Sequence, residues 1–292
     1  MKDLQNLNYI FVKQFYLSLL KAEKLKLGKN NINNFKILKY CLKRIRFNIK
    51  NNFSLILNKK FKKLRKRIKI FEQIIDKFLS FEILIKNFYN IKENLTSDYK
   101  NFEDILLTIQ HSFYFQRINL LKNYDYLELK KGLVDFIWRI KNSRITKKDL
   151  KKVFLKFEKK MSGFYTIVNI IKENCNNENI KLLRKSFIQI RYFIEYFFFI
   201  FKIKYTDSVK LANFNNILSR IKNIDLIIEE LTKIANETNK SNVLGSIAEL
   251  KDYHIIKKKN CIEILNKEIF EKDFLKKLTR IIDGIKENFV IF

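Results

Sequence analysis

The chain has 292 residues, of which 60 are Lys or Arg and 30 are Asp or Glu, so its formal net charge is +30. Hydrophobic residues make up 47% of the chain and aromatic residues 14%, which excludes an intrinsically disordered protein despite the high charge. So large a positive charge repels itself unless an anionic partner relieves it. The composition therefore favours a folded protein that binds a polyanion.

The chain contains no proline and only five glycines, so little in it interrupts a helix. In chain order, the periodicity of apolar residues predicts helices at about 5–26, 33–57 and 59–90, one or two between 97 and 141, then 147–173, 178–204, 207–237 and 244–289, the last as two helices. Asn-rich joints at 30–34 and 176–179 precede two of them, and Asn favours helix caps and turns. We expect an all-α fold.

The helices at 33–57 and 178–204 share one pattern. The apolar residues Phe35, Leu38, Leu42, Ile45 and Ile49 recur 145 residues later as Ile180, Leu183, Phe187, Ile190 and Ile194. Their spacing of three and four residues places them on one helix face, against a core. The helix that follows each also matches, at an offset of 147 residues. We expect one domain over 1–292, with repeats at about 1–143 and 144–292 forming two packed antiparallel bundles related by a pseudo-two-fold axis.

A stripe of cations lies beside the apolar face of the first repeated helix. Lys36, Lys39, Lys43, Arg46 and Lys50 follow the same spacing one residue further on, as a basic ladder about 21 Å long. Residues 24–71 contain 17 Lys or Arg and no acid. A Lys-rich surface produced by codon bias is the alternative, but an ordinary solvated face would intersperse acids to reduce repulsion. The second repeat retains Lys181, Arg184, Lys185 and Arg191.

These residues resemble the conserved histidine α-helical domain, CHAD. Residues 180–195 resemble its signature through Leu183-Arg184 and through Arg191, Tyr192 and Glu195, and Arg44-Ile45-Arg46 resembles the N-terminal counterpart. The resemblance implies two four-helix bundles around a basic groove that binds inorganic polyphosphate. Lysines, Lys36 and Lys181, replace the two histidines of the family signature and carry their charge at any cellular pH. The arginine of the family's next helix corresponds to Ile75 in the first repeat and to Lys222 in the second.

The ladder, the cations that the second repeat retains and the family resemblance together predict eleven polyphosphate-binding residues. They are Lys36, Lys39, Lys43, Arg44, Arg46, Lys50, Lys181, Arg184, Lys185, Arg191 and Lys222. Arginine can hold phosphate oxygens bidentately, whereas lysine acts as a point charge.

Nothing in the sequence supports catalysis, a cofactor or a metal site. The two histidines, His111 and His254, have no carboxylate or thiol at ligand spacing, and the glycines form no phosphate-binding loop. The Glu-x-Glu-x-Lys signature of the triphosphate-tunnel domain that accompanies some CHAD proteins is absent. The three cysteines are far apart in the sequence, which favours buried, reduced thiols. We expect a binding protein rather than an enzyme.

Two other partners remain open. RNA or DNA could use the same basic surface, but Phe35, Phe47, Phe187 and Tyr192 follow the apolar stripe and are expected in the core rather than stacked on bases. An anionic membrane surface would need the apolar side of the ladder helix, which we expect to be packed inside a bundle. The apolar run 192–201 is too short to span a membrane, and the N-terminus is a poor signal peptide. We expect a cytoplasmic protein that associates with polyphosphate granules.

Overall fold

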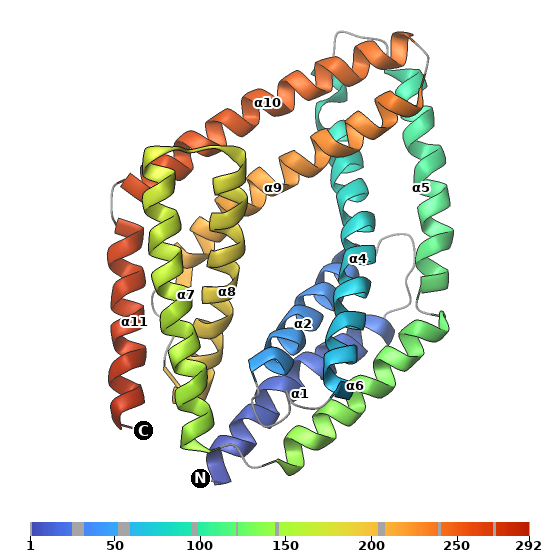
Figure 1. Ribbon diagram of the computed structural model, residues 1–292. Coiled ribbons are helices and arrows are strands. Elements are labelled where there is room, and N and C mark those ends of the chain that lie inside the picture. The colour runs from blue at the N-terminus through green and yellow to red at the C-terminus, as the bar shows by residue number, and fades with distance from the viewer. Residues whose placement is uncertain are drawn as a thin grey trace.

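The computed structural model describes residues 2–24, 32–51, 59–94, 99–120, 122–143, 146–203, 208–238, 241–270 and 273–291. Within them the first half forms α1 (Lys2–Lys24), α2 (Ile32–Asn51), α4 (Lys59–Ile91), the 3-10 turn η1 (Lys92–Asn94), α5 (Lys100–Leu120) and α6 (Tyr124–Asn142). The second half forms α7 (Lys147–Glu173), α8 (Asn177–Phe201), α9 (Ser208–Glu237), α10 (Ser241–Phe270) and α11 (Asp273–Ile291). The described residues contain no strand, and the all-α prediction is confirmed (Figure 1).

The helix boundaries follow the sequence signals closely. Asn176 caps α8 by accepting a hydrogen bond from the backbone N–H of Asn179, as the Asn-rich joint predicts. Thr146 and Asp149 form a capping box at the start of α7. The helix expected at 33–57 is confirmed as far as Asn51, and its remaining residues lie outside the described ones.

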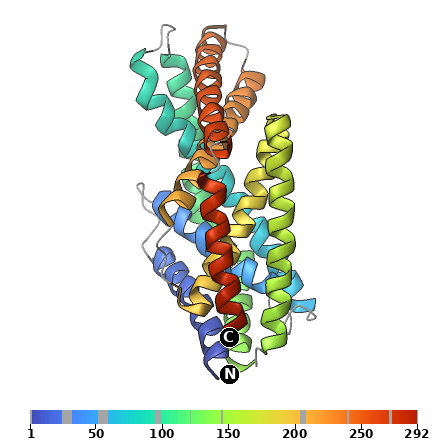
Figure 2. The same cartoon turned by 90° about the vertical axis from the view of Figure 1, so that its left-hand side faces the viewer.

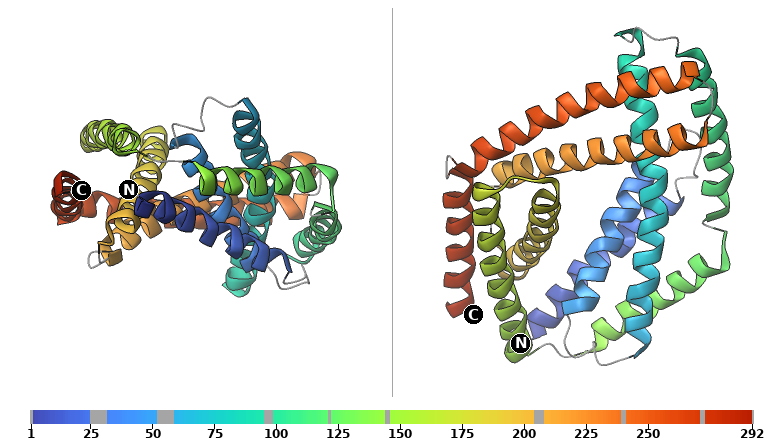
Figure 3. Two further views of the ribbon diagram at one scale, coloured as in Figure 1. Left: turned by 90° about the horizontal axis from the view of Figure 1, so that it is seen from below. Right: turned by 45° about the horizontal axis from the view of Figure 1, so that its top comes forward.

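The helices pack as two groups with a shared extension. One group contains α1, α2, α4 and α6, and the other contains α7, α8, α11 and the first part of α9. The long helices α4 and α9 continue past these groups, where α5 and α10 pack against them (Figure 2). Figure 3 shows α9 and α10 running side by side from the second group to α5. The internal duplication itself stays a prediction.

Two hydrophobic clusters correspond to this arrangement. The larger contains buried residues of both groups, such as Leu42 of α2 and Phe157 of α7, so the groups share one core. The smaller joins the far ends of α4 and α9 to α5 and α10, with Phe88 and Phe102 fully buried. Helical stability in such a fold comes mainly from this packing of apolar faces. The long helices α4 and α9 therefore connect both cores.

Helix α2 meets α8 where the two groups join. The ring of Phe47 on α2 lies 4.8 Å from the ring of Phe193 and 5.8 Å from that of Tyr192, both on α8. Half of the apolar run 192–201 is buried, and its other residues are half-buried. Among the described residues, no helix combines the length and the apolarity needed to cross a lipid bilayer.

Candidate polyanion-binding groove

A groove of about 280 Å³ lies where α2 and α4 face α8 and α9. Its basic side chains come from three of these helices: Lys36, Lys39, Lys43 and Arg44 from α2, Arg184 and Arg191 from α8, and Lys222 from α9. Among its described lining residues, Asp76 of α4 is the only acid. Cations from both halves of the chain therefore converge on one concave surface.

The amphipathic pattern of α2 explains why its cations face the groove. Leu38, Leu42 and Ile45 are fully buried in the core, as their spacing predicts. Each of the cations Lys36, Lys39 and Lys43 directly follows a buried apolar residue of α2, so the three occupy the flank of the helix beside the core face. Burial of the apolar stripe thus fixes the direction in which the ladder points.

Asp76 connects the two halves across the groove. Its carboxylate accepts a hydrogen bond from Lys39 of α2 and lies 3.6 Å from the Nζ atom of Lys222 on α9. Burial acts to raise the pKa of Asp76, but the neighbouring Lys39 and Lys222 outweigh it and hold the pKa below its usual value. Asp76 is therefore ionised and partly neutralises both lysines.

Glu195 of α8 forms a second connection. It accepts hydrogen bonds from Arg44, at 2.8 Å, and from Arg191, at 2.9 Å. The side chain of Arg44 is only 2% exposed, and its guanidinium packs against the rings of Tyr40 and Tyr192. Arg44 is therefore held both by charge and by two aromatic rings.

The remaining cations are crowded. Burial lowers the pKa of Lys43 to about 8, and the neighbouring Lys39 adds to this effect. Burial lowers the pKa of Lys222 to about 8 as well, again with a contribution from Lys39. Burial also lowers the pKa of Arg184, whose Nε atom is buried without a hydrogen-bond partner. The groove contains more positive charge than its acids neutralise, and a bound anion would relieve that excess.

Comparisons with known proteins bear on the fold. No protein-family model matches the sequence, and no curated protein matches it. A crystal structure of the CHAD domain from the plant Ricinus communis superposes on this chain with a TM-score of 0.65, over 99% of this chain and 92% of that one. This chain has the CHAD fold. Sequence identity is 10%, so the similarity concerns the arrangement of the helices.

Within this CHAD fold, seven of the eleven predicted binding residues line the groove and four do not. Arg46 lies on the α4 side of α2, where it pairs with the buried Glu72 at 2.8 Å. Lys50 is exposed at the C-terminal end of the ladder. Lys181 and Lys185 are exposed beside an adjoining hollow, which they share with Arg184 and Lys222. That hollow also contains Asp225 and Glu229, so it is less positive than the groove.

Several groove residues were not predicted from the sequence. Tyr40 is 45% exposed and lines the groove mouth. Asn215, Ser219 and Asn223 form a polar stripe along α9, and their spacing of four residues is a signal that could have revealed them. Phe35, Phe47 and Phe187 are buried as expected, whereas Tyr192 packs against the core and also lines the groove.

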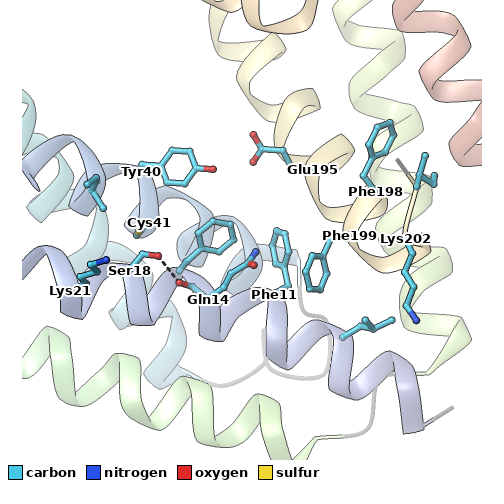
Figure 4. A pocket seen from close by; sticks show the side chains of 14 residues that line it. Phe11, Gln14, Ser18, Lys21, Tyr40, Cys41, Glu195, Phe198, Phe199 and Lys202 are labelled. Carbon is cyan, nitrogen blue, oxygen red and sulfur yellow. Dashed lines mark hydrogen bonds between the residues drawn. The ribbon is translucent and has the colours of Figure 1, made fainter. Parts of the chain in front are cut away.

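A second, larger hollow of about 1070 Å³ lies between α1, α2 and α8 (Figure 4). It is mostly apolar, with Phe11, Phe198 and Phe199 among its lining residues. Tyr40 lines both this hollow and the groove, and Glu195 faces the hollow while holding two arginines of the groove. The smaller groove, rather than this hollow, has the charge that a polyanion requires.

The described residues contain no group of three or more His, Cys, Asp or Glu side chains placed to hold a metal ion. Cys41, Cys175 and Cys261 are free thiols; Cys41 and Cys261 are buried and Cys175 is half-buried.

Replacing Glu195 with Gln is expected to destabilise the fold by roughly 3 kcal/mol, because the buried Arg44 would lose its carboxylate partner. Urea unfolding monitored by circular dichroism measures the change. Glu230→Gln is the matched control, because Glu230 pairs with the exposed Lys233 and this substitution should destabilise the fold by less than about 1 kcal/mol. Equal losses of stability in the two variants would show that the buried Arg44–Glu195 pair stabilises the fold no more than an exposed ion pair does.

Proposed function

We propose that this chain binds inorganic polyphosphate in the groove between α2, α4, α8 and α9, and that it catalyses no reaction on it. The observation that carries the proposal is the convergence of seven cations on a groove with one acidic lining residue among those described. Each cation can neutralise a phosphate and release condensed counterions, which makes the affinity fall as salt rises. The resemblance of residues 180–195 to the CHAD signature supports polyphosphate as the anion.

The cations have different parts in this binding. Lys36 is exposed at the groove and is free to meet an incoming anion. Lys43 and Lys222 are crowded, so a phosphate beside them would favour their charged forms. The Nε–H of Arg184 has no hydrogen-bond partner and can donate a hydrogen bond to a phosphate oxygen. Binding is therefore favoured both by attraction and by relief of repulsion among the cations.

Nucleic acid is the alternative ligand for the same charges. Sequence-tolerant binding of single strands uses exposed aromatic faces for base stacking. The aromatic side chains at this groove, Tyr40 and Tyr192, both pack against the guanidinium of Arg44. Arg44 thus already covers one face of each ring, which favours an anion without bases.

Titration at three salt concentrations tests the choice of ligand. Long-chain polyphosphate, single-stranded RNA of equal phosphate content and anionic vesicles are titrated into the protein. We expect polyphosphate to bind more tightly than RNA, with a steep loss of affinity as salt rises. Vesicles should bind weakly, because Leu38, Leu42 and Ile45 on the apolar face of α2 are buried. RNA binding as tight as polyphosphate binding would refute the choice of anion.

The proposal extends to location. A cytoplasmic protein with this groove should gather on polyphosphate granules. A fluorescent fusion should colocalise with stained granules, and the double variant Lys43→Met/Lys222→Met should remain diffuse. Colocalisation of that variant with the granules would mean that another surface directs the protein there.

Replacing Asp76 with Asn is expected to increase affinity for polyphosphate roughly fivefold at pH 7, because Lys39 and Lys222 lose their competing carboxylate. Isothermal titration at low salt measures the change. Asp135→Asn is the control. This substitution removes the same formal charge as Asp76→Asn, but Asp135 pairs with Lys60 away from the groove. An Asp76 variant that behaves like this control would show that Asp76 does not compete with the anion.

A further inference from the structure

The basic ladder of α2 continues beyond the groove. Lys43 lines the groove, Arg46 lies on the next turn, and the exposed Lys50 follows one turn later. From Lys36 to Lys50 the ladder extends about 21 Å along the helix. The groove therefore covers only the first part of the ladder.

Helix α7 brings lysines to the far end of the ladder. The Phe47 ring of α2 lies 4.8 Å from that of Phe193, and the Phe193 ring lies 5.7 Å from that of Phe157 on α7. Lys156 precedes Phe157 directly and Lys160 follows it by about one turn. The packing of these three rings thus places α7 lysines beside the end of α2.

Helix α4 adds an arginine at the same place. Lys39 pairs with Asp76 and Arg46 with Glu72, so α4 runs antiparallel to α2. Residues that precede Glu72 on α4 therefore lie beside residues that follow Arg46 on α2. Arg65 precedes Glu72 by about two turns, and Lys50 follows Arg46 by about one turn. Both residues are exposed.

The charges of these residues act on one another. Partial burial lowers the pKa of Lys50, and Lys160, Arg65 and Arg46 lower it further. Burial also lowers the pKa of Lys156, with Lys50 adding to the effect. The mutual repulsion agrees with the placement that the ring contacts and ion pairs indicate.

We propose that Lys50, Arg65, Lys156 and Lys160, the outer cluster, form a second contact surface for the same polyanion. A chain bound in the groove would continue along the ladder past Arg46 and reach α4 and α7. The inference rests on the proposed function, because it takes the groove as the first contact. It means that the protein prefers anions long enough to span the ladder, about 21 Å. Tripolyphosphate, with three phosphates, would occupy the groove alone.

The test compares two anions on two matched triple variants. The outer-cluster variant is Lys50→Gln/Arg65→Gln/Lys160→Gln. The control is Lys86→Gln/Lys257→Gln/Lys286→Gln, which removes three exposed charges from α4, α10 and α11. The outer-cluster variant should lose roughly tenfold in affinity for long-chain polyphosphate. The slope of log affinity against log salt should become shallower by about 2. Its affinity for tripolyphosphate should equal that of the control.

Two results would overturn the inference. One is a loss of long-chain affinity no greater than that of the control. The other is an equal loss of affinity for tripolyphosphate and for the long chain. That result would mean that the outer cluster affects binding in the groove and does not form a separate contact with long chains. If the unmodified protein bound neither anion, the proposed function would fail, and the inference with it. Circular dichroism spectra of all three proteins check that the exposed substitutions leave the helices intact.

Discussion

The double variant Lys43→Met/Lys222→Met should bind long-chain polyphosphate at least about a hundredfold more weakly than the unmodified protein. Both lysines line the groove, one from each half of the chain. A hydrogen bond to a charged group contributes about 1.5–3 kcal/mol, so the loss of two such contacts corresponds to this factor or more. Isothermal titration at pH 7 and low salt measures it.

The same variant should be at least as stable as the unmodified protein at pH 7. The pKa of each lysine is lowered to about 8 in the fold from an ordinary value near 10.5, so the fold disfavours the charged forms. At pH values above about 8 the unfolded chain binds more protons than the folded one, and stability therefore rises with pH until about 10.5. At pH 7 the full cost of both charges is present. Methionine removes this cost and keeps an apolar stem of similar length.

Urea unfolding at pH 7 and pH 9.5 tests that expectation. The unmodified protein should gain stability at the higher pH relative to the double variant, in which this gain is absent. The control Lys86→Met/Lys257→Met removes two exposed charges outside the groove and should change binding by less than a few-fold. A double variant that binds within tenfold of the unmodified protein would contradict a binding role for these lysines. A double variant that is clearly less stable at pH 7 would contradict the expected cost of their charges in the fold.

The sequence predicted the helices well because their signals are local. Without proline, apolar residues at three- and four-residue spacing leave few alternatives to long helices, and Asn176 marks the start of α8. The structure divides the two longest uncertain segments, 97–141 and 244–289, into helix pairs. A CHAD fold was expected from the resemblance, and the superposition on the plant domain confirms it.

The composition of the groove was harder to predict because it depends on helix rotation. Successive residues on a helix differ by about 100° around its axis, so neighbours on a basic stripe can face different surfaces. On α8, Arg184 lines the groove, whereas Lys181 and Lys185 border the adjoining hollow. Arg46 belongs to the predicted ladder but pairs with Glu72 on the α4 side. Periodicity identifies the stripe, and tertiary packing decides which of its members share a site.

Ion pairs between distant residues have no local signature. Arg44 and Glu195 lie 151 positions apart, and Lys39 and Asp76 lie 37 apart. The spacing of Arg191 and Glu195 does indicate a pair along one helix, yet it gives no sign of Arg44. The acids that balance the groove could therefore be recognised only once the helices were placed beside one another.

The affinity for long-chain polyphosphate should fall as the pH rises from 7 to 9.5. Lys43 and Lys222 have pKa values of about 8 in the free protein, and a bound phosphate favours their charged forms. Above pH 8, binding must therefore take up protons, and affinity decreases by up to tenfold per pH unit for each lysine. One such lysine accounts for about a thirtyfold loss between pH 7 and 9.5, and the second adds to it. Isothermal titration in buffers of equal ionic strength measures the loss.

The variant Lys43→Arg/Lys222→Arg separates this effect from a general loss of charge. Arginine stays protonated throughout this pH range, so the variant should lose no more than a few-fold in affinity between pH 7 and 9.5. Proton uptake supplies a second measure, because the enthalpy of binding at pH 9 should depend on the ionisation enthalpy of the buffer only in the unmodified protein. An equal loss of affinity in both proteins would mean that the titrating groups lie elsewhere. Unequal losses would assign the pH dependence to two lysines that come from different halves of the chain and face the same groove.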